Sequence, residues 1–279
     1  MKTFLLATAA VLASTSAYAA DYDVAHPFYT PAEGKFVSTT DFEFEHTFDK
    51  VKNADRKSSD DEKTFTETLK YGITDDIQVG LEISRDWEKE KWKSDTWGIA
   101  GVNRDYTNSW SVNAGYNVIN DGKAFLNVGL EFRETYLREP TGIGTSVKTH
   151  GRDFFINAIG GYNFDDVTVF GEITYDRMYY SSVNNINKIR FYTLEAGAYK
   201  AINEQISART SLLAEYDQTK NAEERTYWWT VGADYLISKK MGVGVRAAYM
   251  LDNDVNGHPI GNEDAHSGYK LGIDFTVEF

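Results

Sequence analysis

The last eleven residues of the chain alternate between two kinds of side chain. From Tyr269 to Phe279 every odd position is apolar or aromatic, every even position is charged, polar or glycine, and the chain stops on Phe279. Successive side chains of a β-strand point to opposite faces, so this pattern predicts a strand with one face in an apolar environment and the other in a polar one. Lipid on one side and water on the other surround a strand in the wall of a membrane barrel. Odd positions here are therefore predicted to face lipid, and even positions to face the interior.

The N-terminus has the pattern of an export signal. Lys2 precedes an apolar stretch over 4–13, which leads through small residues to Ala17-Tyr-Ala. No later segment reaches the roughly 18 apolar residues of a membrane-spanning helix, so only strands could carry the chain across a membrane. We therefore expect three parts: a signal peptide at 1–20, a short periplasmic N-terminal segment at 21–33, and an outer-membrane barrel at 34–279.

The composition excludes several classes of protein. The chain has no cysteine, so disulfides and thiolate metal sites are ruled out. Its net charge of −13 argues against a nucleic-acid partner, because such binding depends on Lys and Arg that neutralise phosphates. Only four prolines occur, and none falls inside a candidate strand.

Period-two alternation along the chain predicts an all-β fold, a transmembrane antiparallel up-and-down β-barrel of about twelve strands. The stretch 94–105 also has strand character, which leaves ten or fourteen strands open. A soluble lipocalin-like barrel or sandwich is the alternative fold, with its apolar face turned inward. The predicted strands are 35–49, 63–73, 77–88, 106–118, 124–137, 153–164, 167–180, 188–201, 206–218, 225–237, 241–252 and 267–279.

The predicted connections alternate between short and long, as periplasmic turns and extracellular loops do in outer-membrane barrels. Two residues do not fit the lipid face, Glu67 and His46, and we expect them at the rim or at a bulge. A tyrosine precedes each tight turn, which predicts an aromatic girdle at the membrane interface, although Tyr199 has the less apolar parity of its strand. The girdle tyrosines are Tyr71, Tyr116, Tyr162, Tyr199 and Tyr235; the long loops are 50–62, 89–105, 138–152, 181–187, 219–224 and 253–266.

A final strand that ends on Phe279 resembles the C-terminal assembly signal of Gram-negative outer-membrane β-barrels, the porin-like superfamily. This resemblance implies a place in the cell outer membrane, contact with outer-membrane lipid and lipopolysaccharide, and recognition of Phe279 by the barrel assembly machinery. Size and strand count are similar to those of the monomeric oligogalacturonate and sialic-acid porins, so a monomer is expected. Those families import acidic sugars through a basic lumen, and the charge balance here is the reverse.

The polar parity of the strands carries a surplus of carboxylates, which in a narrow passage attract cations and repel anions. The sequence therefore predicts a passive channel for small hydrophilic solutes, with cations or neutral compounds favoured. The alternative is a non-conducting structural, ligand-binding or adhesive barrel whose inner charges only pair with one another. The selectivity residues predicted are Asp41, Glu43, Glu45, Glu82, Glu131, Glu172 and Glu195, with Arg133, Arg209 and Arg246 as transverse partners.

No catalytic constellation emerges from the sequence. A serine-type mechanism needs a histidine beside a serine and an orienting third group, and none of the five histidines shares a strand face with such partners. The segment 252–266 concentrates Asp, Glu and His, but it has no fixed ligand spacing, so we interpret it as a solvated acidic loop. We predict no enzyme activity, no metal and no cofactor; a barrel enzyme with its catalytic residues on the loops is the third alternative.

Overall fold

A computed structural model describes residues 24, 29–51, 56–94, 99–120, 123–140, 146–164, 167–182, 185–218, 223–256 and 265–279. None of these residues forms a helix long and apolar enough to cross a membrane. The strands are β1 (Phe36–Val51), β2 (Arg56–Gly72), β3 (Ile77–Ser94), β4 (Ile99–Asn120), β5 (Ala124–Pro140), β6 (Ser146–Phe164), β7 (Val167–Ser182), β8 (Asn185–Ala201), β9 (Ile206–Gln218), β10 (Glu223–Ser238), β11 (Met241–Asn256) and β12 (Ala265–Glu278).

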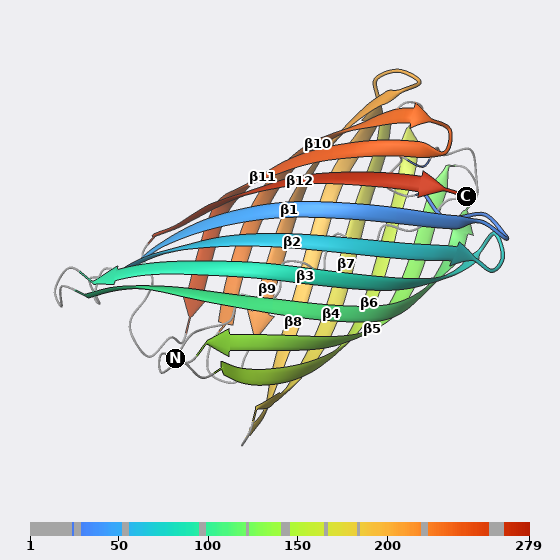
Figure 1. Ribbon diagram of the computed structural model, residues 1–279. Coiled ribbons are helices and arrows are strands. Elements are labelled where there is room, and N and C mark those ends of the chain that lie inside the picture. Colours follow the sequence, from blue (N-terminus) through green and yellow to red (C-terminus); the bar gives the residue numbers. More distant parts are fainter. Residues whose placement is uncertain are drawn as a thin grey trace.

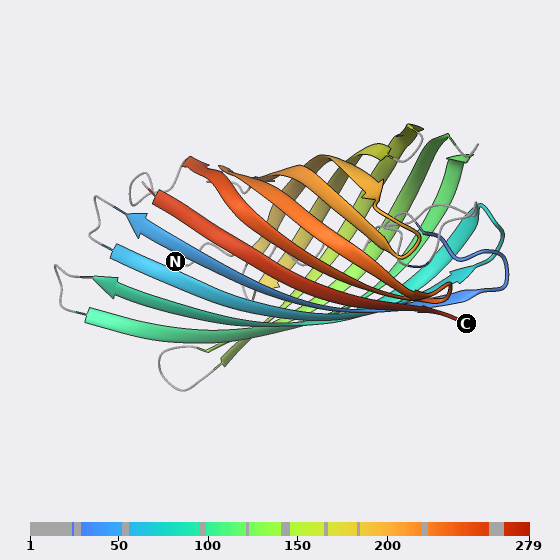
Figure 2. The same ribbon diagram turned by 90° about the horizontal axis from the view of Figure 1, so that it is seen from above.

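The twelve strands form one closed antiparallel barrel in which each strand pairs with its sequence neighbours. The first and last strands close the wall, with pairs running from Val37 opposite Glu278 to Lys50 opposite Ala265. Figure 1 shows β1, β2 and β3 crossing the near wall, while β7, β8 and β9 run along the far wall in another direction. Figure 2 shows the same tilted strands from above. Closure leaves no unpaired sheet edge, as a wall in lipid requires.

The two faces of the wall have opposite character. Exposed large apolar side chains occupy the outward parity of nearly every strand, whereas the inward parity holds Glu, Asp, Thr, Ser and Asn that are shielded from solvent. A soluble barrel would bury the apolar face, so the lipocalin-like alternative is excluded. Outward residues at least half exposed include Leu81, Ile83, Leu130, Ile173, Leu194, Leu212 and Leu271.

The prediction of twelve strands is confirmed, but four predicted loops are wrong. Most residues of these loops belong to strands, because β2, β3, β4, β6, β7 and β8 extend past the predicted ends; the loops are 50–62, 89–105, 138–152 and 181–187. The stretch 94–105 lengthens β4 and adds no strand. Beyond the membrane both faces of the wall meet water, so polar sequence such as Glu88-Lys-Glu-Lys91 can continue the ladder without alternating apolar residues.

Four of the five tyrosines predicted for the girdle face outward, as expected, and one does not. Tyr116, Tyr162 and Tyr235 are exposed on the outer surface, and Tyr71 shares their face. Tyr199 lies on the inward face and is buried. Its strand, β8, has Ala196 and Ala198 at the outward positions beside it, so parity and not residue type decides the direction.

The two misfits on the lipid face have different explanations. His46 lies in the outer part of β1, as expected for the rim, and its Nδ1 is 2.8 Å from Asp61 Oδ1. Glu67 lies within the apolar band, four residues from Tyr71, and the β1–β2 register has no bulge there. Instead, Ser38 donates a hydrogen bond to Glu67 at 2.6 Å and Thr40 donates another at 2.5 Å. These hydroxyls reduce the cost of a carboxyl group facing lipid.

The segment before β1 folds against the inner side of β2 at the end of the barrel that holds the tight turns. The Gly34 amide donates to the Gly72 carbonyl at 2.9 Å, and the Gly72 amide donates to the Lys35 carbonyl at 3.1 Å. Gly34 has a φ of +77°, which favours glycine. The Tyr29 hydroxyl donates to the Glu278 carboxylate, and burial followed by this hydrogen bond raises the pKa of Tyr29 above its ordinary value.

Replacing Gly72 with alanine should detach this segment. A Cβ at residue 72 would collide with the backbone carbonyl oxygens of Pro31 and Ala32, which cannot rotate away. We expect amide exchange in the 29–35 peptide of Gly72→Ala to accelerate about tenfold or more, with the strands still protected. Hydrogen exchange followed by mass spectrometry measures this. Gly171→Ala is the matched control, because its Cβ would meet only ordinary contact. Equal exchange in both variants would contradict the docking of the segment.

Candidate functional site

The inward face is the candidate functional site, and three buried cations organise much of it. Arg246 of β11, Lys270 of β12 and Arg133 of β5 each contact two or more carboxylates. Period-two alternation places each of them inward, because its strand neighbours Val245, Leu271 and Phe132 take the lipid side. Most of the acids come from other strands, and those of β1 reach Arg246 and Lys270 because the sheet closes between β1 and β12.

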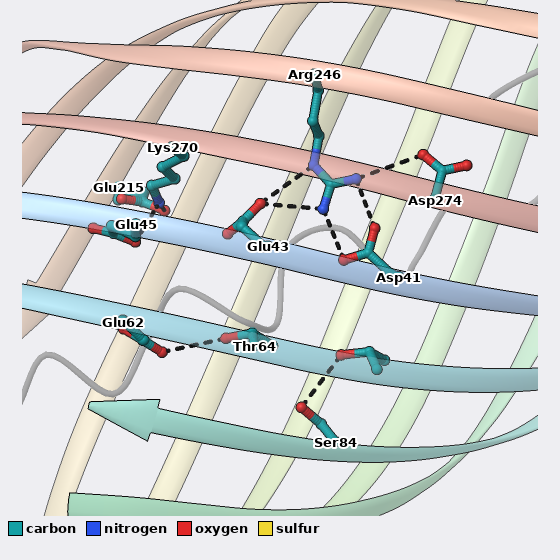
Figure 3. A network of polar contacts seen from close by, with 11 residues as sticks. Asp41, Glu43, Glu45, Glu62, Thr64, Ser84, Glu215, Arg246, Lys270 and Asp274 are labelled. Carbon is teal, nitrogen blue, oxygen red and sulfur yellow. Dashed lines mark hydrogen bonds and ion pairs between the residues drawn. The ribbon is translucent and has the colours of Figure 1, made fainter. Parts of the chain in front are cut away.

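Arg246 forms the most extensive of these ion-pair clusters (Figure 3). Its two Nη atoms donate to the two Asp41 oxygens at 2.6 and 2.8 Å, a bidentate arrangement that fits the planar guanidinium. Its Nε and Nη2 both donate to Glu43 Oε2, at 3.2 and 3.1 Å. Asp274 lies 3.6 Å from Nη1. Three carboxylates thus share one guanidinium, and the cluster keeps a net negative charge.

A glycine makes room for this cluster. The strand between β11 and β1 is β12, and its residue opposite both Arg246 and Glu43 is Gly272. A Cβ there would lie 2.5 Å from Arg246 Cζ, so only glycine lets the guanidinium lie flat across the strand. Gly232 has the same role beneath Arg209, whose Nε is 2.8 Å from the position of a Cβ. Long polar side chains therefore lie along the wall at these glycines.

Lys270 joins parts of the wall that are further apart. Its Nζ is 3.3 Å from Glu45 on the adjacent β1 and 3.9 Å from Glu215 on β9, three strands away in the other direction. The ammonium also lies 4.1 Å from the centroid of the Trp228 ring, whose Nε1 donates to Glu215 at 2.8 Å. Trp228 is only 2% exposed. Glu45, Lys270 and Glu215 thus form a chord, a line of ion pairs that crosses part of the interior from β1 to β9.

Arg133 forms the third cluster. Its Nη2 is 2.7 Å from Glu131 on its own strand and 3.1 Å from Glu82 on β3. The intervening β4 contributes Ser111, which is opposite both residues and is small enough to be crossed. The Arg133 guanidinium also lies 4.7 Å from the centroid of the Phe155 ring.

Two of the arginines predicted as transverse partners, Arg133 and Arg246, make their ion pairs along the wall. Arg133 and Arg246 pair with acids on the same strand or up to two strands away. Adjacent strands are about 4.8 Å apart, so two strands lie within reach of an arginine side chain, whereas the opposite wall of a barrel of this size does not. The ion pairs therefore run along the wall.

The wall formed by β6 to β9 carries more acids than bases on its inward face. Asp153, Asp176 and Asp217 face inward, and none of them forms an ion pair with a residue in the described part of the chain. Asp153 and Asp176 are 2% and 4% exposed, and the Oδ1 atom of each lacks a hydrogen-bond partner there. Glu172 of β7 is directly opposite Glu195 of β8 on the same face. Acidic side chains are thus concentrated on one side of the interior.

All ten residues predicted to line the lumen lie on the inward face. Asp41 and Glu43 meet Arg246, Glu82 and Glu131 meet Arg133, and Glu45 meets Lys270, whereas Glu172, Glu195 and Arg209 lie elsewhere on the wall. The prediction missed Asp153 and Glu62, because it placed one at the edge of a strand and the other in a loop. Continuing the two-residue alternation of β6 and β2 beyond their predicted ends would have placed both residues on the inward face. The ten residues are Asp41, Glu43, Glu45, Glu82, Glu131, Arg133, Glu172, Glu195, Arg209 and Arg246.

Histidine chemistry has little support in the described part of the chain. His46 lies beside Asp61, and His150 stacks on Tyr136 with Glu134 at 3.7 Å; neither forms a hydrogen bond with a serine there. No group of three or more His, Asp or Glu side chains among the described residues could hold a metal ion. Most of the acidic segment 252–266, together with His26 and His258, lies outside the described residues.

Comparison with known proteins gives a fold but no family. No protein-family model and no curated protein matches the sequence. The transport unit of the autotransporter AIDA-I from Escherichia coli is 11% identical over 88% of this chain and 90% of that one, with a TM-score of 0.60. The translocator domain of the autotransporter NalP from Neisseria meningitidis, also 11% identical, covers 88% of both chains with a TM-score of 0.53. A mutant of the monoaromatic hydrocarbon channel TodX, 10% identical, covers 90% and 91% with a TM-score of 0.51.

These similarities concern the fold. Together with the closed twelve-stranded wall and its apolar outer band, they define the chain as an outer-membrane β-barrel. The predicted superfamily and the predicted location in the cell outer membrane are thereby confirmed. The similar structures include channels as well as translocator barrels, so the fold alone does not select between these functions.

Removing Arg246 should destabilise the barrel strongly. In Arg246→Met the buried Asp41 and Glu43 carboxylates lose their partner, which costs about 3–5 kcal/mol in comparable buried pairs. The same change at Arg152, an exposed partner of Glu134, should cost no more than about 1 kcal/mol. Urea unfolding in lipid vesicles gives both values.

A rescue variant sharpens this test. Adding Asp41→Asn and Glu43→Gln to Arg246→Met removes the unpaired charges and should restore most of the loss. Equal unfolding midpoints for Arg246→Met and Arg152→Met would show that the cluster contributes no stability.

Proposed function

We propose that this protein is a passive diffusion channel for small hydrophilic solutes, with cations and neutral compounds favoured over anions. The observation that carries the proposal is the surplus of inward carboxylates. Asp153, Asp176 and Asp217 have no basic partner in the described part of the chain, and three acids share Arg246. Uncompensated charge in a low-dielectric passage concentrates ions of opposite sign and repels ions of the same sign.

The arrangement of the ion pairs also supports a passage. Because glycines such as Gly272 and Gly232 let arginines lie flat, charged side chains line the wall there and do not extend toward the axis. In this proposal the selectivity residues act as a lining. Asp41, Glu43, Glu82 and Glu131 lie beside their arginines, while Glu172 and Glu195 lie on the opposite wall.

A second candidate function is a structural or ligand-binding barrel that does not conduct. The specific observation in its favour is the Glu45–Lys270–Glu215 chord packed on Trp228. Inward side chains such as Ile159, only 1% exposed, also point to close packing in part of the interior. The predicted absence of enzyme activity belongs to both proposals and stays a prediction.

Single-channel recording in a planar bilayer under a potassium chloride gradient tests the proposal. Purified protein should conduct, with a reversal potential on the cation-selective side. Asp153→Asn/Asp176→Asn should lower the cation-to-anion permeability ratio by a factor of about 2 or more, because it removes unpaired lumen charge. Glu134→Gln makes the same chemical change on the outer surface and should leave the ratio unchanged.

Two outcomes would contradict the channel as proposed. Folded protein that never conducts would favour the structural barrel. Anion selectivity would overturn the assignment of the acidic wall to the conducting path, and so would equal permeability ratios in the double variant and the Glu134→Gln control.

A further inference from the structure

Two arginines face each other on the lipid side of the barrel. Arg177 of β7 and Arg190 of β8 are directly opposite in the strand register, and both have outward parity. Like charges placed directly opposite on one face of a sheet destabilise the pairing of the strands. A pair of this kind therefore needs an anion nearby to offset the repulsion.

The described part of the chain supplies no such anion. Neither Arg177 nor Arg190 forms an ion pair there. Arg190 Nη1 donates only a long hydrogen bond, 3.5 Å, to Gln218, and the Arg177 guanidinium lies 5.1 Å from the centroid of the Tyr179 ring. Arg177 Nε is buried and has no hydrogen-bond acceptor.

Outward acids two strands away on either side, Glu134 of β5 and Glu223 of β10, already have other partners. Glu134 accepts hydrogen bonds from Arg152 at 3.0 Å and from Tyr136 at 2.9 Å. Glu223 accepts a hydrogen bond from Gln218 at 3.2 Å. Arg152 is an outward arginine that is paired with a carboxylate, that of Glu134. Arg177 and Arg190 have no such carboxylate among the described residues.

The position of the pair along the wall identifies the anion. Tyr175, Tyr192 and Tyr216 form a row of rings with centroids 5.1 and 5.9 Å apart on the same outer face. Amphipathic rings mark the interface between membrane and water. Arg177 and Arg190 lie two residues beyond this row, toward the end of the barrel opposite the tight turns. That level is where lipid headgroups of the outer leaflet lie.

The surface below the row is suited to hydrocarbon. On the same two strands, Ile173 and Leu194 are opposite each other and more than half exposed. A ligand that satisfies this face carries acyl chains for Ile173 and Leu194, and an anionic group four residues higher along the strands for the arginines. Guanidinium groups bind phosphate oxygens bidentately, which favours phosphate among the anions of a headgroup.

We propose that Arg177 and Arg190, above the tyrosine row, form a binding site for a phosphorylated lipid headgroup of the outer leaflet. Lipopolysaccharide supplies this chemistry. The two guanidinium groups hold the phosphate between them, the tyrosine rings pack beside the headgroup, and the acyl chains run down the apolar wall. The site is independent of whether the lumen conducts.

Lipid binding by the purified, folded, full-length protein tests this site. Native mass spectrometry in detergent with EDTA present would compare bisphosphorylated lipid A, the same lipid with its phosphates removed, and inorganic phosphate. Wild-type protein should retain the phosphorylated lipid at least about tenfold better than the dephosphorylated lipid, with little binding of inorganic phosphate. Equal retention of the two lipids would overturn the proposal, and so would inorganic phosphate binding as tightly as the phosphorylated lipid.

Matched variants locate the site. Arg177→Gln/Arg190→Gln should lose most of the preference for phosphorylated lipid. Arg152→Gln removes an outward arginine on the neighbouring wall that already has Glu134, so it should keep the wild-type preference. Heat-dependent gel migration confirms that each variant is folded. If the double variant does not fold, the wild-type comparison of phosphorylated with dephosphorylated lipid still decides. Equal loss in the double variant and in Arg152→Gln would contradict a site at this pair.

Discussion

Hydrogen bonding of the backbone in lipid is the constraint on which the rest of this structure depends. Lipid offers no partner for an unpaired amide or carbonyl, so every strand must have two neighbours and β1 must meet β12. Closure then fixes which residues lie across from one another. The cluster around Arg246 draws on three strands from the two ends of the chain, and it exists only because those ends are joined.

The same closure separates two kinds of chemistry by parity. Each strand carries an apolar row for lipid and a polar row for the interior, so a shift of one residue would exchange them. Buried charges on the polar row are tolerated because carboxylates and cations meet with good geometry along the wall. Acids outnumber bases on β6 to β9. Ion pairs there cannot offset the electrostatic potential of every acid. In the proposed channel, stability and selectivity would both draw on this inward row of side chains.

Alternation made the barrel and its twelve strands predictable from the sequence, because lipid imposes a two-residue period wherever the wall is in the membrane. The period is lost where both faces meet water, so the outer extensions of β2 and β4 were predicted as loops and Asp153 was left at a strand edge. The partners in the ion pairs were predicted less well than the face of the wall on which each residue lies. The partners of Arg133 and Arg246 depend on cross-strand register and on small neighbours such as Ser111 and Gly272, which period-two alternation does not determine.

The inward glycines have a consequence for how such a wall can change. Gly272 and Gly232 have no side chain of their own, so at these positions the wall is only as thick as the backbone and the arginine side chain that lies flat on it. Substituting a larger residue there would raise the arginine toward the axis without altering any hydrogen bond of the sheet. Aperture and scaffold are therefore separable properties, and barrels with the same twelve-stranded ladder can differ in bore through a few positions that have no side chain of their own.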